Sequence, residues 1–211
     1  MSLDALDAAL FRTLSGGRGD VEEVIAGIAA ATAAGFAPVK LNCVVQRGVN
    51  DGEVLRLGEF AREHGHVLRF IEYMDVGTCN GWSRERVVPS AELRDAIHAQ
   101  WPLRPLDPQY RGEVAARYAY ADGSGEIGFV SSVSEPFCGD CHRARVSAGG
   151  QLYTCLFAGD GHDLRQALAE GEAALVDCVA GIWSRRVDRY SELRGRAASA
   201  RKHVEMYLIG G

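Results

Sequence analysis

VKLNCVVQ, residues 39–46, decides the fold class that this chain can adopt. Its β-branched, apolar composition and the turn signal Asn50-Asp51-Gly52 that follows it predict a β-strand. A second run, VLRFIEYM at residues 67–74, has the same character. Between the two, apolar residues recur among charges and predict an amphipathic helix that closes near Gly65: Val54, Leu57, Phe60 and Ala61.

Further helices are predicted before the first strand and after the second. Asp20-Val21-Glu22-Glu23 is typical of a helix start, with a carboxylate three residues after the cap, and this helix is predicted to end at Gly35. Another helix is predicted from Ser90 to about Gln100. Strands and helices that alternate with short connections imply parallel strands and crossover helices, so residues 1–101 are predicted to form an α/β region.

Both predicted strands carry polar residues, Lys40 and Asn42 in the first and Arg69 and Glu72 in the second. A strand buried on both faces of an open parallel sheet would be apolar throughout. Polar strand residues suit a barrel whose interior faces a ligand. Exposure to solvent on an edge strand explains the same pattern equally well.

The chain changes character from Leu103 onward. Turn sequences at 121–125 and 148–150 are flanked by strand-like runs and predict two β-hairpins. Helices are predicted over residues 163–170 and 172–183. Residues 102–211 are therefore predicted to form a smaller α+β region with hairpins.

Composition excludes several classes of function. The chain has 211 residues and a formal net charge of −5, which argues against a dedicated nucleic-acid-binding protein. Local basic clusters remain possible, and one of them, SRRVDRYSELRGR near the C-terminus, is interpreted as a solvated helix face. No apolar run approaches the roughly 20 residues that span a bilayer, and the N-terminus lacks a secretory signal. We expect a cytoplasmic protein whose cysteines are reduced and serve as ligands or catalysts.

The stretch FCGDCHRARVSAGGQLYTCLF, residues 137–157, carries the chemistry: Cys138, Cys141 and Cys155 have the spacing C-x2-C-x13-C. Cys138, Cys141 and His142 match a haem-attachment signature, but that reading leaves Cys155 unused. A structural zinc site would need a fourth ligand, for which His162 is the candidate. An iron–sulfur cluster with three cysteine ligands would leave one iron open to a substrate.

Arg143 and Arg145 follow the second cysteine and, at i and i+2 of a strand, would share one face. Guanidinium groups bind phosphate oxygens in pairs of hydrogen bonds. A structural metal site does not need two aligned arginines, whereas a site for a phosphorylated substrate does. An exposed polar strand face is the alternative interpretation of the arginines, and zinc and iron–sulfur both remain open.

The same stretch resembles the C-terminal cluster motif of the molybdenum-cofactor GTP 3′,8-cyclases, a family of radical S-adenosylmethionine enzymes. The similarity extends along the chain through SLDAL at residues 2–6, VKLNCVVQRGVND at 39–51, LRFIEYMDVG at 68–77 with GW at 81–82, and the terminal IGG. The resemblance implies an incomplete, truncated TIM-type βα barrel over residues 1–101. It implies a small α+β iron–sulfur and GTP-binding region with a Gly-Gly tail over residues 102–211.

The resemblance also implies roles for individual residues. Cys138, Cys141 and Cys155 would ligate a [4Fe–4S] cluster whose open iron receives the guanine of GTP, with Arg143 and Arg145 beside it. Other matching positions would contact the triphosphate (Lys40 and Arg69), line the S-adenosylmethionine pocket (Asn42 and Met74) or enter the active site as the tail (Gly210 and Gly211). The reaction would convert GTP into (8S)-3′,8-cyclo-7,8-dihydroguanosine 5′-triphosphate for molybdopterin biosynthesis.

The resemblance names partners as well. GTP is the substrate, a homodimer is a candidate assembly, and cyclic pyranopterin monophosphate synthase is the functional successor in the pathway. No nucleic acid and no membrane are expected.

The chain departs from the family pattern in one respect, since none of its six cysteines has the C-x3-C-x2-C spacing of the cluster that generates the radical. We therefore expect a truncated chain that is inactive alone, with an open parallel edge on its first strand. A non-catalytic nucleotide-binding fragment and a zinc-stapled structural protein are the alternatives. Cys43 and Cys178 are interpreted as small buried apolar residues, and Cys79 is left without a partner.

Overall fold

The computed structural model describes residues 1–77, 79–194 and 204–208. The chain divides into two compact units. Unit 1 comprises Met1–Met74 and Ser83–Glu135, and unit 2 comprises Asp75–Trp82 and the residues from Pro136 onward. The functional boundary predicted between residues 101 and 102 stays a prediction. The compact units divide elsewhere, because the strands after residue 102 continue the sheet of unit 1.

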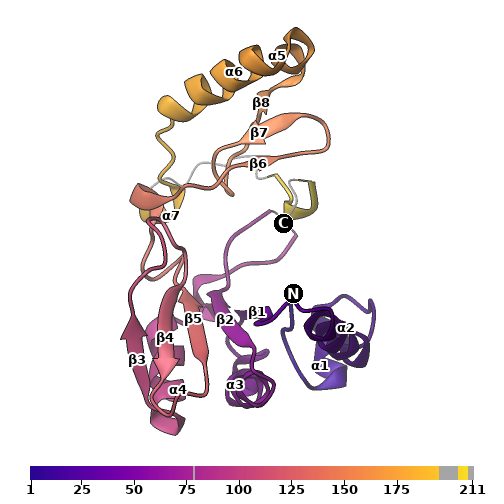
Figure 1. The fold of residues 1–211 in the computed structure, drawn as a ribbon, viewed down its shortest axis with the longest axis vertical. Coiled ribbons are helices and arrows are strands. Elements are labelled where there is room, and N and C mark those ends of the chain that lie inside the picture. Colours follow the sequence, from indigo (N-terminus) through magenta and orange to yellow (C-terminus); the bar gives the residue numbers. More distant parts are fainter. Residues whose placement is uncertain (78, 195–203, 209–211) are drawn as a thin grey trace. The chain divides into compact units, whose positions relative to one another are not determined.

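Unit 1 is a mixed α/β structure built on a mixed five-stranded sheet (Figure 1). Its strands lie in the order β1 (Lys40–Val45), β2 (Val67–Glu72), β5 (Glu126–Val130), β4 (Ala116–Tyr120) and β3 (Leu103–Leu106). The pairs β1–β2 and β2–β5 are parallel, whereas β4 and β3 are antiparallel to their neighbours. Within the described residues the sheet stays open and does not close into a barrel.

The helices of unit 1 follow the sequence pattern closely. The predicted capping box of Asp20 and Glu23 is present at the start of α2, and α4 has the predicted bounds. The helix α1 and the strand β3 were not predicted. The helical segments are α1 (Ala8–Leu14), α2 (Val21–Ala33), α3 (Val54–Glu63) and α4 (Ser90–Gln100), with short 3-10 turns at Asp51–Glu53 and Arg84–Arg86.

Alternation along the strands separates a buried face from a polar face. In β1, Leu41, Cys43 and Val45 are fully buried in the core, while Lys40 and Asn42 point to the other side. For Glu72, one of the polar strand residues, a ligand-facing interior and a solvent-exposed edge were both left open, and the residue is instead fully buried in unit 1. It lies on the buried face of β2 because it is an odd number of positions from Arg69.

The open edge predicted for β1 is covered by the first residues of the chain. Ser2 forms a parallel bridge with Asn42. The Leu3 N–H donates to the Asn42 carbonyl at 2.9 Å, and the Asn42 N–H donates to the Met1 carbonyl at 2.8 Å. The edge that we expected to be unpaired therefore has backbone partners here.

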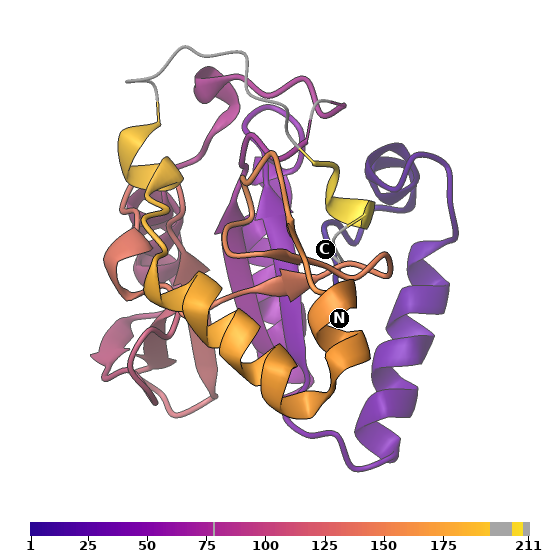
Figure 2. The same cartoon turned by 90° about the horizontal axis from the view of Figure 1, so that it is seen from above.

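Unit 2 contains a three-stranded antiparallel sheet in the order β6–β7–β8, followed by helices. Figure 2 shows the consecutive helices α5 and α6 in orange. The predicted second hairpin and both predicted helices are present. The elements are β6 (Arg145–Val146), β7 (Gln151–Tyr153), β8 (His162–Asp163), α5 (Arg165–Glu170), α6 (Glu172–Ser184) and α7 (Tyr190–Leu193), with 3-10 turns at Cys138–Asp140 and Met206–Leu208. None of the helices in the described ranges is long and apolar enough to cross a bilayer.

Candidate functional site

The polar face of unit 1 brings together three of the predicted residues. Asn42 and Arg69 are paired in the register of β1 and β2, and Lys40 lies two residues before Asn42 on the same exposed side. The Arg69 Nε donates a hydrogen bond to Asn42 Oδ1 at 2.9 Å. Because this bond uses only Nε, both terminal amino groups of the guanidinium are without a partner among the described residues. Met74 follows β2 and is half-buried.

Gly128 leaves space for the Arg69 side chain. The sequence analysis did not single out this glycine. Gly128 lies beside Arg69 in the register of β2 and β5. A Cβ at Gly128 would lie 3.2 Å from Arg69 Cγ and 3.3 Å from the Ala115 Cβ. The bare backbone therefore lets the arginine side chain lie across the neighbouring strand. A glycine inside a strand pattern was the sequence signal that could have pointed to this close approach.

The cysteine segment, residues 137–157, lies in unit 2. Cys138 opens a 3-10 turn, Cys141 ends it, and Cys155 follows β7. All three side chains are half-buried. Cys141, Arg143 and Arg145 alternate with exposed residues, so they lie on the same half-buried side. Only Arg145 belongs to a strand, because Arg143 precedes β6.

The charges in this segment are close enough to influence one another. Burial opposes ionisation of Cys141, but hydrogen bonds from the Arg143 backbone and side chain, together with Arg186, outweigh it and lower the pKa of the thiol. Burial is the main reason why the pKa of Cys155 is raised, and Cys138 adds to the shift. The Arg186 guanidinium thus acts on both Cys141 and Cys155, and the charge of Cys138 reaches Cys155.

The two predicted arginines interact with two of these thiols, Cys141 and Cys155. Burial and the neighbouring Arg143 lower the pKa of Arg145, whereas Cys141 and Cys155 act in the opposite direction. The Arg143 guanidinium lies over the Phe137 ring, 5.1 Å from its centroid. Its buried Nε has no hydrogen-bond partner in the described part of the chain, so it is a donor available to a ligand.

The described residues do not contain three or more His, Cys, Asp or Glu side chains gathered as a preformed metal site. His162, the candidate fourth zinc ligand, is exposed on β8 and lines a pocket that none of the three cysteines lines. His142 is also exposed. Among the residues that the structure describes, neither a Cys3His zinc site nor a three-cysteine cluster site is preformed.

Two further residues that hold the cysteine segment were missed by sequence reasoning. Arg186 donates to the carbonyl oxygen of Cys141, and Glu192 Oε1 accepts from the Gly139 N–H at 3.2 Å. Both come from the basic run that was interpreted as a solvated helix face. That interpretation is wrong for Arg186 and Arg194, whose side chains are only 11% and 7% exposed.

The other three cysteines and the terminal glycines lie outside the cysteine segment. Cys43 is fully buried, as predicted, and burial with the charges of Asp4 and Glu53 raises the pKa of its thiol well above the usual range. Cys178 lies in α6 as expected but is half-buried. Cys79 is exposed and has a partner after all, since its Sγ lies 3.5 Å from a Glu205 carboxylate oxygen. Gly210 and Gly211 lie outside the described residues.

Fold and site together define an α/β protein in which a mixed sheet with one polar face is followed along the chain by a segment rich in cysteine and arginine. Residues 66–192 match the model of the family described as Molybdenum Cofactor Synthesis C. This match covers more than half of the chain, which therefore belongs to that family.

Curated relatives agree with this assignment. The chain is 65% identical over 211 residues to a GTP 3′,8-cyclase of Xanthomonas campestris pv. campestris. The alignment covers all of this chain and 62% of the relative. It is 52% identical over 200 residues to the GTP 3′,8-cyclase of Acidothermus cellulolyticus, covering 92% of this chain and 55% of the relative. A Synechococcus GTP 3′,8-cyclase is 48% identical over 222 residues, covering 100% of this chain and 63% of the relative. The chain thus spans less than two thirds of the length of these relatives.

Proposed function

We propose that this chain is the GTP-binding portion of a GTP 3′,8-cyclase, a lyase that converts GTP to (8S)-3′,8-cyclo-7,8-dihydroguanosine 5′-triphosphate in molybdopterin biosynthesis. One observation carries the proposal: Cys141, Arg143 and Arg145 lie on one half-buried side of the segment that also holds the half-buried Cys138 and Cys155. Thiolates suit a soft metal centre, and paired guanidinium groups suit a phosphorylated ligand. The names of the relatives support the same assignment.

Within unit 1, we assign Lys40 and Arg69 to the triphosphate. Arg69 is oriented by its bond to Asn42 and by the space over Gly128, so two of its nitrogen atoms can face an anion. Lys40, exposed on the same face, supplies a second positive charge. These cations offset the negative charge of the triphosphate and hold it in one orientation.

Within unit 2, we assign Cys138, Cys141 and Cys155 to a [4Fe–4S] cluster. The donor set fits by its chemistry, because three half-buried thiols lie in one segment and cationic donors lower the pKa of Cys141. When bound, such a cluster supplies an iron with one position not occupied by the protein. Arg143 and Arg145 would bind substrate oxygens beside it, and the unpartnered Nε of Arg143 is the donor best placed to do so.

The remaining roles follow the family resemblance. Asn42 and Met74 are proposed to line the S-adenosylmethionine pocket, and Gly210 and Gly211 are proposed as the active-site tail. The parallel strands β1, β2 and β5, with α3 between the first two, support the proposal that the sheet is part of a TIM-type barrel. Homodimer formation and transfer of the product to cyclic pyranopterin monophosphate synthase stay predictions.

A second candidate function is nucleotide binding without catalysis by these 211 residues alone. It is favoured by the cysteine spacing, since no three of the six cysteines have the form C-x3-C-x2-C. In this case the chain binds GTP but generates no 5′-deoxyadenosyl radical from S-adenosylmethionine.

Anaerobic purification followed by iron, sulfide and zinc analysis tests the cluster, and calorimetry with GTP tests the arginines. We expect iron and sulfide, and GTP affinity at least tenfold weaker in Arg143→Ala and Arg145→Ala than in the parent. Arg18→Ala, a change at an exposed loop arginine, is the matched control. Zinc without iron would remove the cluster assignment, and unchanged affinity in both variants would remove the arginines from the site. Formation of 5′-deoxyadenosine from S-adenosylmethionine in the presence of a reductant would exclude the second candidate function, nucleotide binding without catalysis.

A further inference from the structure

The segment between α6 and α7 ties together both arms of the cysteine segment. Arg186 donates through Nη1 to the Cys141 carbonyl oxygen and through Nε to Asp188 Oδ2, the latter at 3.2 Å. The same oxygen of Asp188 accepts a hydrogen bond from Thr154 Oγ1 at 2.6 Å. Thr154 precedes Cys155 in the chain. One ion pair therefore connects the backbone at Cys141 with the residue next to Cys155.

These contacts are largely withdrawn from solvent. The Arg186 side chain is 11% exposed and Asp188 is 30% exposed, while Thr154 is buried. The guanidinium also lies over the Trp183 ring, 4.8 Å from its centroid. A guanidinium held by a carboxylate, a carbonyl and an aromatic ring has little freedom to reorient, and loss of one partner leaves buried polar groups unsatisfied.

Arg186 also acts through its charge. Its guanidinium donates to the Cys141 carbonyl oxygen, which places the positive charge beside this residue. Hydrogen bonds and charge around the sulfur ligands set the reduction potential of iron–sulfur clusters. A fixed positive charge stabilises the more negative, reduced state of such a cluster more than the oxidised state.

We infer that Arg186 and Asp188 form a positioning clamp, which sets the separation of Cys141 and Cys155 and makes the cluster that they ligate easier to reduce. This inference rests on the proposed function, because it takes these cysteines as cluster ligands. Arg186 and Asp188 act through the ligands, so they are positioning residues.

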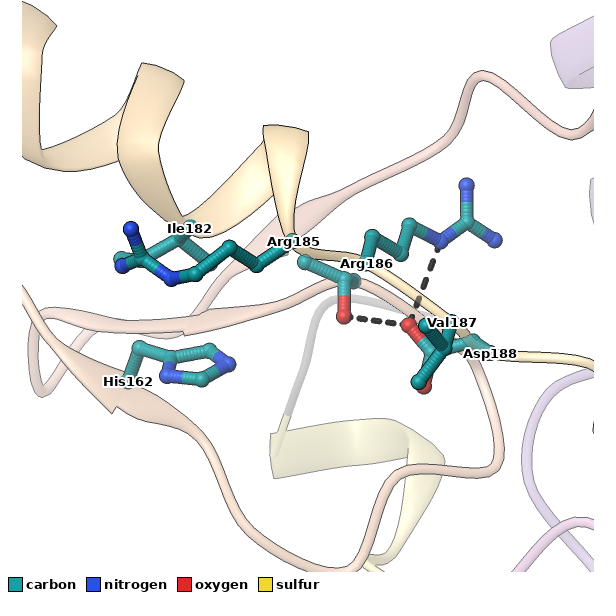
Figure 3. A pocket seen from close by; sticks show the side chains of 7 residues that line it. His162, Ile182, Arg185, Arg186, Val187 and Asp188 are labelled. Atoms are coloured by element: carbon teal, nitrogen blue, oxygen red, sulfur yellow. Dashed lines mark hydrogen bonds and ion pairs between the residues drawn. The ribbon is translucent and has the colours of Figure 1, made fainter.

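The neighbouring Arg185 supplies a matched control. Arg185 and the clamp line a pocket of about 260 Å³ together with Thr154, His162, Ile182 and Val187. In Figure 3 the Arg185 side chain extends toward His162, whereas Arg186 extends to the opposite side, next to Asp188. Within the described residues Arg185 makes no hydrogen bond or ion pair. Its replacement therefore removes the same charge from the same segment and leaves the clamp intact.

The experiment compares the anaerobically reconstituted 211-residue chain with Arg186→Met, Arg186→Lys, Asp188→Ala and the control Arg185→Met. Iron and sulfide per chain report on positioning, and a redox titration followed by electron paramagnetic resonance reports on the potential. Thermal unfolding of the metal-free chains identifies a variant that does not fold, in which case Arg186→Lys carries the test.

We expect Arg186→Met and Asp188→Ala to retain at least twofold less iron than the parent. The residual cluster of Arg186→Met should have a more negative potential. Arg186→Lys should restore the potential toward that of the parent, because lysine keeps the positive charge. It should not restore the iron content, because lysine cannot bond Asp188 and the Cys141 carbonyl together as the guanidinium does. Arg185→Met should match the parent in both measurements.

Two outcomes overturn the inference in distinguishable ways. A parent chain that takes up no iron overturns the cluster assignment and the clamp together. A parent with a full cluster, and Arg186 and Asp188 variants indistinguishable from Arg185→Met in iron content and potential, overturns the clamp alone.

Discussion

Glu72 is the buried carboxylate on which we base the most specific prediction about stability. It ends β2, is 0% exposed, and accepts four hydrogen bonds from two separate segments. Oε2 accepts from the N–H groups of Val133 and Ser134 at 2.7 and 2.8 Å. Oε1 accepts from the Ser90 N–H at 2.8 Å and the Ser134 hydroxyl at 2.5 Å. The side chain thus joins β2 to the start of α4 and to the loop after β5.

Replacement of Glu72 by glutamine keeps the shape and changes one acceptor into a donor. The better orientation places the amide oxygen at the Oε2 position, which preserves the bonds from Val133 and Ser134. The amide NH2 then faces the Ser90 N–H, which loses its acceptor. A buried N–H without a partner costs about 1–3 kcal/mol, and the two remaining bonds lose the assistance of the charge. The lower cost of burying a neutral amide offsets part of this loss, so we expect Glu72→Gln to destabilise unit 1 by about 2–4 kcal/mol.

Urea unfolding followed by circular dichroism measures the loss, and hydrogen exchange locates it. Protection of the Ser90 amide should fall most in Glu72→Gln. Glu92→Gln is the control with the same chemical change, because its side chain is 54% exposed in an ion pair with Arg47 and should cost less than about 1 kcal/mol. A loss below about 1 kcal/mol for Glu72→Gln, with the Ser90 amide as protected as in the parent, would refute the reasoning.

Three further predictions concern single residues. Gly128→Val should weaken GTP binding severalfold, because the new side chain displaces Arg69. Gly52→Ala, at a glycine with open space around it, should leave GTP binding unchanged. Equal GTP affinities of the two variants in calorimetry would contradict this prediction. Burial, followed by a neighbouring histidine, lowers the pKa of His66. The unfolded chain therefore binds more protons than the folded chain, so stability should fall as the pH drops below about 6.5. The melting temperature of His66→Gln should fall less steeply with pH than that of the parent. Parallel curves would exclude His66 as the cause. The Cys43 thiol, 0% exposed, should react with a thiol reagent only after unfolding, and rapid reaction in the native chain would disprove its burial.

Local patterns in the sequence determined most elements of unit 1 and marked the cysteine and arginine residues of unit 2 as candidates. The strands β1 and β2 and the helices α2, α3 and α4 were predictable because periodicity, caps and turns act over a few residues. The spacing of Cys138, Cys141 and Cys155 and the two arginines after them was equally visible. These signals require only neighbours along the chain.

Only the tertiary structure decided which distant segments meet. It joined the hairpin strand β5 to the parallel strand β2, which placed Gly128 beside Arg69. It turned Glu72 into the core, where its hydrogen-bond partners lie 18 to 62 positions away. It also brought Arg186 to Cys141 across 45 positions, although the basic run read as a solvated surface. Such contacts depend on strand order and on which face each side chain occupies, and a local pattern does not encode either of them.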